Sequence, residues 1–159
     1  MNDYKYYLDY AIYDINSGKY SDGLEKLNQA IALKKDWELP YFYRGVANQA
    51  LENFDDAILD YTKAIEINPQ MTDAYYNRAK ILLSRKDVEN PDINRAISDL
   101  EKALEQDPNF ADALYAMGAA QKKLENYEKA IEYLERVIAL QPDFIYAKAL
   151  KTLIHNKYL

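Results

Sequence analysis

Hydrophobic and small residues recur along the chain at a fixed spacing. Three columns of similar residues can be traced, and within each column successive members lie 34, 39 and 34 residues apart. Such a period is typical of a solenoid built from repeated helix pairs, because each repeat buries its apolar face only against its neighbours. The columns are Tyr20, Phe54, Ile93 and Tyr127; Gly23, Ala57, Ala96 and Ala130; and Ala30, Ala64, Ala103 and Val137.

The period divides most of the chain into four units, and each unit reads as two helices. Small residues lie halfway along each first helix and recur on three of the second helices, where a missing side chain lets the two helices approach closely. The units span residues 4–37, 38–71, 72–110 and 111–144, with five additional residues in the third. The small residues are Ala11, Gly45, Ala79 and Gly118 on the first helices and Ala57, Ala96 and Ala130 on the second helices.

Three prolines mark the ends of units. Proline cannot continue a helix, and it biases the residue before it away from the helical region. The sequence therefore predicts turns at Asn68-Pro69, Asp107-Pro108 and Gln141-Pro142. The first unit has Lys35 at the proline position, so Pro40 is expected to serve that junction instead.

The additional residues of the third unit fall between its two helices, from Ser84 to Pro91. Asn90 and Pro91 indicate a helix start, with Asn90 as the N-cap and Pro91 at the first helical position. The longer loop is either a neutral surface insertion or an extra contact for a partner.

Residues 145–159 have the apolar spacing of one further amphipathic helix. We expect this helix to cover the exposed face of the fourth unit, because the ends of a solenoid need a cap. Its apolar residues are Ile145, Ala149, Leu150, Leu153 and Ile154.

The second unit carries a recognisable signature. It has an aromatic residue, a small residue, a polar one, alanine, an aromatic residue, alanine and proline at Tyr41, Gly45, Asn48, Ala57, Tyr61, Ala64 and Pro69. Over residues 4–144 the chain therefore resembles the tetratricopeptide repeat family. The resemblance implies an all-α fold, a right-handed α-α superhelix of four helix-turn-helix repeats followed by a C-terminal capping helix.

The resemblance also implies a concave groove lined by the first helices, where an extended peptide or a single helix of another protein would bind. Tyr43 and Tyr76 are expected to be exposed in this groove, whereas Phe42 could equally pack between adjacent first helices. Asn77 or Lys80 would fix backbone or carboxylate groups of the ligand. The full lining is Leu8, Ile12, Phe42, Tyr43, Val46, Asp73, Tyr76, Asn77, Lys80, Asp112, Tyr115, Ala119 and Lys122.

One subgroup of the family, the chaperone-binding cochaperones, clamps a C-terminal carboxylate with Lys and Asn, then Asn, then Lys and Arg on three successive first helices. Chaperone tails are not the expected ligands here, because the cations are missing and aspartates replace some of them. We expect a neutral or basic ligand. In units two to four the clamp positions carry Phe42, Val46, Asn77, Asp112 and Ala116, and in units one to three they carry Leu8, Ile12, Tyr43, Asp73 and Asn77.

Tyrosines crowd the first helix, and helical spacing puts Tyr6, Tyr10 and Tyr13 on one face. In the family this face meets a preceding repeat, which is missing here. Two interpretations are open. The face is an amphipathic edge that stays exposed to water because the tyrosine hydroxyls are polar, or it is an interface at which the chain binds a second copy or a partner.

Charge and composition narrow the function. The 159 residues carry a net charge of -6, which argues against nucleic acid as a partner because phosphate binding needs a basic surface. There is no cysteine, which suits a reducing compartment. Neither a secretory signal nor a membrane span is visible, so a soluble, cytoplasmic protein without membrane contact is expected.

No catalytic motif is present. His155 is the only histidine and has no partner to share a metal, so no metal or other cofactor is expected. Carboxylates such as Asp55, Asp56, Asp99 and Glu132 are expected to lie on solvated helix faces. The chain is therefore not expected to be an enzyme.

Two function classes remain. The first is an adaptor or scaffold that binds a peptide or helix of a partner in its groove. The alternative is a structural module that assembles with itself through the tyrosine-rich edge. Both are compatible with a monomer or a weak homodimer.

Overall fold

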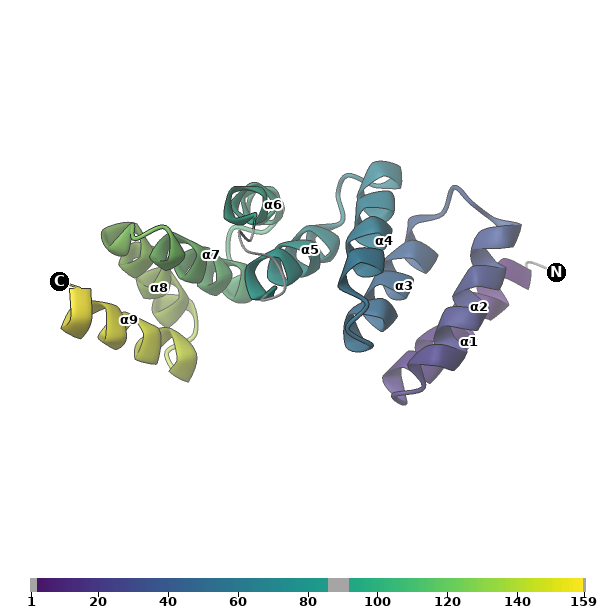
Figure 1. Ribbon diagram of the computed structural model, residues 1–159, viewed down its shortest axis with the longest axis horizontal. Coiled ribbons are helices and arrows are strands. Elements are labelled where there is room, and N and C mark those ends of the chain that lie inside the picture. The colour runs from purple at the N-terminus through teal and green to yellow at the C-terminus, as the bar shows by residue number, and fades with distance from the viewer. Residues whose placement is uncertain (1–2, 86–91, 159) are drawn as a thin grey trace. The chain divides into compact units, whose positions relative to one another are not determined.

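The chain folds into α-helices. The computed structural model describes residues 3–85 and 92–158, and over these residues it contains nine helices and no strand (Figure 1). This confirms the all-α fold expected from the period. The helices are α1 (Asp3–Asn16), α2 (Tyr20–Leu33), α3 (Glu38–Ala50), α4 (Phe54–Ile67), α5 (Thr72–Ser84), α6 (Ile93–Gln106), α7 (Ala111–Lys123), α8 (Tyr127–Leu140) and α9 (Ile145–Tyr158).

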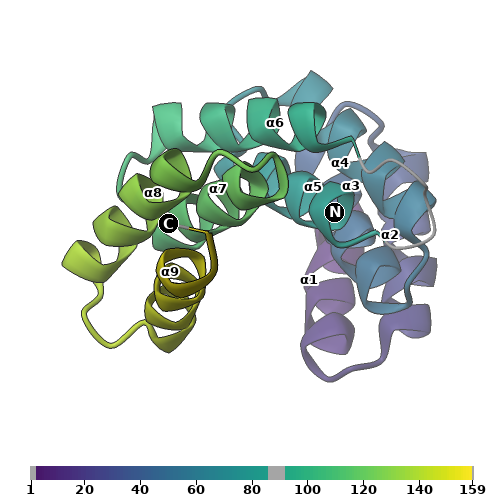
Figure 2. The ribbon, with the colours of Figure 1, turned by 60° about the vertical axis from the view of Figure 1, so that its left-hand side comes forward.

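The chain divides into two units, Met1–Ile81 and Leu82–Leu159. In the first unit α1 packs against α2 and α3 against α4, while α2 also contacts α3. In the second unit α7 packs against α8, and α6 and α9 flank this pair (Figure 2). Each unit is therefore built from helix pairs stacked on their neighbours in sequence.

The turn inside three of the pairs has one conformation. Gly18, Glu52 and Glu125 follow α1, α3 and α7 with φ of 76°, 61° and 60°. The residue after each donates its backbone N–H to a carbonyl five residues earlier, as from Asn53 to Asn48 at 2.9 Å. This is the left-handed helix C-terminus that glycine adopts without strain, so both glutamates sit in a conformation unfavourable for them.

The three predicted proline turns are confirmed. Asn68, Asp107 and Gln141 each end a second helix, and the two residues after each form a turn. The first helix pair, α1 and α2, is followed by the same turn at Lys35 and Asp36, which contains no proline. Proline is therefore not required at this junction, and Pro40 instead lies buried in the first turn of α3.

The predicted start of α6 is wrong. The helix begins at Ile93, and its N-cap is Asp92, whose side chain accepts a hydrogen bond from the backbone N–H of Arg95 at 3.0 Å. Aspartate caps a helix as well as asparagine does. Asn90 and Pro91, and with them most of the Ser84–Pro91 loop, lie outside the described residues.

The small residues permit the close packing expected of them. All seven are buried. A Cβ atom on Gly45 would lie 2.8 Å from the Tyr61 ring, and one on Gly118 would lie 3.1 Å from the Leu134 side chain. The helices of each pair therefore meet where one side chain is missing.

The C-terminal helix forms as predicted, but part of its predicted buried face is wrong. Ala147 and Ile154 are buried against α7 and α8, where they contact Leu114, Leu134 and Val137. Ile145, Ala149 and Leu153 are exposed instead. The helix has two apolar stripes, and the one that contains the small Ala147 fits the preceding pair.

Candidate functional site

The residues predicted to line the groove differ in how far they are exposed. Leu8 is a correction, because it is only 4% exposed and belongs to the core formed by Ala11, Ile15 and Leu27. Ile12 and Val46 are half-buried and pack at the edge of this core. The aliphatic part of the predicted lining therefore serves mainly to join α1 to α3.

The aromatic part remains partly accessible. Phe42 and Tyr43 on α3 are half-buried, and their rings meet edge to face at 5.3 Å. Tyr76 on α5 is also half-buried, with the ammonium group of the exposed Lys80 5.4 Å from its ring. Tyr43 and Tyr76 are expected to be exposed and are instead half-buried, because each ring packs on its neighbours along one side. Asp73, on the same helix, is exposed.

Asn77 has a partner within the fold. Its side chain hydrogen-bonds to the hydroxyl of Tyr61, which in turn donates to Gln49 Oε1 at 2.9 Å. Burial raises the pKa of the Tyr61 hydroxyl, the neighbouring charge of Asp60 adds to the rise, and the bond from Asn77 opposes it. Asn77 therefore helps to fix α5 against α4, a role that the sequence did not reveal.

In the second unit, the predicted residues all lie on α7. Asp112 is exposed, whereas Tyr115, Ala119 and Lys122 are half-buried. The Tyr115 ring packs against Phe144 at 5.4 Å, just before α9. A short aromatic surface therefore continues from α7 to the start of α9, in addition to the capping role predicted for that helix.

The three tyrosines of the predicted edge are exposed on α1. The exposed fractions are 56% for Tyr6, 48% for Tyr10 and 67% for Tyr13. The rings of Tyr6 and Tyr10 lie 4.4 Å apart, and the adjacent Tyr10 hydroxyl raises the pKa of Tyr6. These residues form one aromatic face that nothing in the described chain covers.

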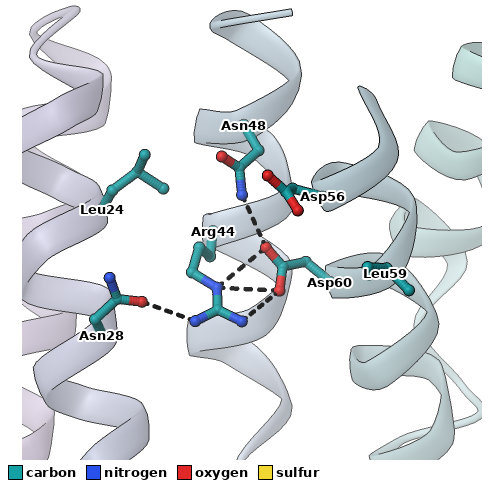
Figure 3. Close-up of a pocket in the computed structure, with 7 residues that line it drawn as sticks. All are labelled: Leu24, Asn28, Arg44, Asn48, Asp56, Leu59 and Asp60. Carbon is teal, nitrogen blue, oxygen red and sulfur yellow. Dashed lines mark hydrogen bonds and ion pairs between the residues drawn. The ribbon is translucent and has the colours of Figure 1, made fainter. Parts of the chain in front are cut away.

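A polar pocket that is not predicted from the sequence lies between α2 and α4 (Figure 3). Its floor is Arg44 on α3, which donates to Asp60 Oδ1 on α4 at 2.6 Å and to Asn28 Oδ1 on α2 at 2.7 Å. Asn48 donates to the other carboxylate oxygen of Asp60 at 3.0 Å. The pocket measures about 330 Å³ and is lined by Leu24, Asn28, Arg44, Asn48, Asp56, Leu59 and Asp60.

The same linkage recurs along the chain. Arg78 donates to Thr62 at 2.8 Å, and Lys151 donates to Glu135 at 2.6 Å. In each case, as for Arg44 and Asn28, a cation on α3, α5 or α9 reaches a residue sixteen positions earlier, on the helix that precedes it. The repeat period combined with the charge pattern would have predicted these contacts.

One expectation about the carboxylates is wrong. Asp99 is buried rather than solvated, as are Asp60 and Asp14, whereas Asp55, Asp56 and Glu132 are exposed as expected. Asp14 is held by Lys26 at 2.6 Å. Buried carboxylates persist when they are paired, so these three are structural elements of the helix stack.

The described residues contain no group of His, Cys, Asp or Glu that could hold a metal ion. In the same part of the chain, no buried side-chain nitrogen or oxygen lacks a hydrogen-bond partner. His155 is exposed on α9, beside Lys151 and Thr152. Nothing in these surroundings points to catalysis. Among the described helices, none is long and apolar enough to cross a membrane.

Comparison with curated proteins gives partial matches. RNA polymerase II-associated protein 3 of Rattus norvegicus is 33% identical over 131 residues, which are 76% of this chain and 20% of that protein. Mitochondrial import receptor subunit TOM70 of Homo sapiens is 35% identical over 69 residues, which are 40% of this chain and 11% of the receptor. The chain thus spans a fifth or less of the length of these two relatives.

Solved structures share the fold. A fragment of MamA from Desulfovibrio magneticus RS-1 superposes with a TM-score of 0.87 at 23% identity, covering 97% of this chain and 84% of that one. The first TPR of Spaghetti (RPAP3), bound to the HSP90 peptide SRMEEVD, superposes with a TM-score of 0.69 at 26% identity, covering 75% and 90%. The likeness to MamA shows the fold alone.

Two family models, both described as tetratricopeptide repeat, match residues 39–71 and 88–154. Together with the helix pairs and the buried small residues between them, these matches show that the chain is a member of the tetratricopeptide repeat family.

Proposed function

We propose that this chain is an adaptor that binds an extended peptide or a single helix of a partner protein along its first helices. The half-exposed aromatic residues of α3 and α5 carry the proposal, because aromatic side chains supply rigid contact surface at protein interfaces. The repeats are 4–37, 38–71, 72–110 and 111–144, with residues 145–159 as the cap. The first helices are then α1, α3, α5 and α7.

The first unit offers the larger part of the binding surface. Phe42 and Tyr43 supply it on α3, and Tyr76 with Lys80 supplies it on α5. Ile12 and Val46 form the apolar base between the aromatic rings, and Leu8 makes no contact with the ligand because it is buried. The Asn77 side chain already hydrogen-bonds to the Tyr61 hydroxyl, so only its remaining hydrogen-bonding groups can contact the ligand.

The second unit offers a separate, shorter surface on α7. Tyr115 supplies the aromatic contact and Ala119 leaves space beside it. Asp112 is exposed and available to a basic group of the ligand, whereas Lys122 is half-buried. Phe144 extends it towards α9.

The ligand is neutral or basic. Asp73 and Asp112 are exposed, and the chain carries a net charge of -6. The related TPR of Spaghetti is bound to the HSP90 peptide SRMEEVD, which contains three carboxylate side chains. Exposed aspartates would repel such a peptide, since like charges brought together at an interface weaken binding and suppress wrong partners.

The test begins with a selection from a random peptide library displayed on phage, using the purified chain as bait. Selected peptides should be enriched in apolar residues with Lys or Arg and depleted in Asp and Glu. For one selected peptide, the dissociation constant should rise about tenfold or more in a Tyr43→Ala, Tyr76→Ala double variant.

Two further variants serve as controls. Leu59→Ala changes an exposed residue on α4, away from the proposed surface, and should leave the dissociation constant unchanged. Asp73→Lys, at an exposed position, should weaken binding of a basic peptide without affecting the fold. Selection of acidic peptides, or equal binding by the double variant, would contradict the proposal.

A further inference from the structure

The tyrosine face of α1 corresponds to the face by which the other first helices dock. In each later repeat and in α9, the residues at the positions equivalent to Tyr6 and Tyr13 are fully or almost fully buried. The residues equivalent to Tyr6 are Pro40, Ala74, Ala113 and Ala147, and those equivalent to Tyr13 are Ala47, Ile81, Ala120 and Ile154.

The contacts of these buried residues show what the face does. Ala47 of α3 packs into the core formed by Leu8, Ala11 and Leu27, which belong to the preceding pair α1 and α2. Ala147 and Ile154 of α9 pack in the same way into the core of α7 and α8. The face therefore attaches a first helix to the helix pair before it. In α1 it carries tyrosines and attaches to nothing in the described chain.

The C-terminal helix exposes apolar residues on its outer side. Ile145 is 75% exposed, Tyr146 72% and Leu153 47%. With Ala149, which is also exposed, they form a stripe opposite the buried Ala147 and Ile154. On an isolated chain this stripe would leave a row of large apolar side chains in water.

The two helices are complementary in charge. α9 carries three lysines and one histidine and has no carboxylate residue. α1 carries three aspartates against one lysine. Asp9 is exposed, and with Tyr10 and Tyr13 it lines a shallow pocket of about 320 Å³. On α9, the exposed Lys148 flanks the apolar stripe. Both helices are 14 residues long.

We propose that the tyrosine face of α1 in one copy of the chain docks on the apolar stripe of α9 in a second copy. The tyrosine rings cover Ile145 and Leu153, and Asp9 faces Lys148. This contact joins two different surfaces, so it is heterologous and builds chains or rings rather than a symmetric dimer. It does not use Tyr43 or Tyr76, so it is independent of the proposed peptide binding.

The decisive experiment blocks one end of the chain at a time. Tyr6→Ser with Tyr13→Ser blocks α1, and Ile145→Ser with Leu153→Ser blocks α9. All four residues are exposed, so both variants should fold, which circular dichroism can verify. Sedimentation velocity would then compare the wild type, each variant alone and an equimolar mixture of the two.

The wild type should form concentration-dependent species larger than a dimer. Each blocked variant should be a monomer, with self-association weakened about tenfold or more. The mixture should form a 1:1 dimer and nothing larger, because it contains one functional α1 face and one functional α9 face. A mixture that stays monomeric would overturn the proposal. So would association of the α9-blocked variant with itself, which would indicate contact between two α1 faces.

A charge exchange provides a second readout. Asp9→Lys should weaken the association of the wild type, and Lys148→Asp should do the same. Combining both substitutions in one chain restores opposite charges across the contact and should recover association. Failure of the combined variant to recover, when each single variant is impaired, would contradict the placement of Asp9 opposite Lys148.

Discussion

Arg44 and Asp60 form a two-point ion pair between α3 and α4, in which Arg44 Nη2 lies 2.6 Å from Asp60 Oδ1 and Arg44 Nε lies 3.1 Å from Asp60 Oδ2 (Figure 3). The remaining terminal nitrogen of Arg44 reaches Asn28 on α2 at 2.7 Å. One guanidinium group thus joins three successive helices. The planar fork of arginine suits this arrangement, whereas lysine could not bind both carboxylate oxygens and Asn28 with fixed geometry.

Removing Arg44 should therefore be costly. Asp60 is 4% exposed, so Arg44→Ala leaves a buried carboxylate that still accepts a hydrogen bond from Asn48 but has lost the guanidinium group that neutralises it. We expect the free energy of unfolding to fall by about 3 kcal/mol, near the lower end for breaking a buried ion pair, because Arg44 is partly exposed. Urea denaturation measures this change. Asn28→Ala, which removes the exposed end of the network, should cost less than about 1 kcal/mol. Equal losses in the two variants would contradict a central role for the ion pair.

The sequence predicted the repeat well and the polar contacts poorly. The small and apolar columns determine which residues can be buried between helices, and the structure buries Ala57, Ala96 and Ala130 where the columns placed them. Asp60 and Asp99 were missed because a carboxylate on an amphipathic helix usually faces water. Asp60 and Asp99 lie 39 residues apart, the same step that separates the apolar columns, and this recurrence is what distinguishes them from surface charges.

The predicted binding surface was harder to derive than the fold. Register assigns a residue to a helix face but does not say how closely the next helix covers that face. Leu8 was therefore placed in the groove although Leu27 and Ala47 enclose it in the core. Similarly, α9 has two apolar stripes of comparable strength, and side-chain size at Ala147 decides which of them is buried.

Gly45 should not tolerate even a methyl group. A Cβ atom there would lie 2.8 and 2.9 Å from two carbons of the Tyr61 ring, which is fully buried and has no space to move. Gly45→Ala should lower the free energy of unfolding by about 1–3 kcal/mol through overpacking. This loss should appear although alanine favours a helix over glycine by about 1 kcal/mol.

Two comparisons make this prediction specific. Gly118→Ala should cost less, because its new Cβ would meet the flexible Leu134 side chain at 3.1 Å. Gly45→Ala should also lower the stability little when it is combined with Tyr61→Leu. The equivalent positions one repeat earlier carry Ala11 and Leu27, and these two residues pack in the same core. Thermal melts of these variants measure the effects, and a Gly45→Ala protein as stable as the wild type would refute the tight contact.

Tyr61 should make the stability of the first unit sensitive to alkaline pH. Its pKa in the folded chain is raised above the ordinary value of 10.0, mainly by burial. The fold therefore favours the neutral hydroxyl, and this contribution is fully present below about pH 10 and is lost as pH rises above the unfolded-state pKa. At pH 7, Tyr61→Phe should be about 1 kcal/mol less stable than the wild type, because the hydrogen bond to Gln49 is lost.

Above pH 10 this difference should shrink, since phenylalanine has no proton to lose on unfolding. Urea denaturation at a series of pH values from neutral to alkaline would show the two stability curves converging. Tyr13→Phe, at an exposed position, is the matched control for loss of one hydroxyl and should follow the wild-type curve. A difference between wild type and Tyr61→Phe that does not change with pH would contradict the raised pKa.

The orientation of α9 can be tested with two isoleucines on the same helix. Ile154 is fully buried against α7 and α8, whereas Ile145 is 75% exposed. Ile154→Ala should lower the free energy of unfolding by about 2–4 kcal/mol, because it leaves a cavity between α9 and the preceding pair. Ile145→Ala should change it by less than about 0.5 kcal/mol.

Both variants should be measured by denaturation at a protein concentration low enough to keep the chain monomeric, because Ile145 also lies in the proposed docking stripe. Under these conditions the difference reports only on packing within the chain. If the two substitutions cost the same, α9 is not held by the face that contains Ala147. If Ile145→Ala costs more, the stripe of Ile145, Tyr146 and Leu153 is the packed face and is unavailable for a second copy.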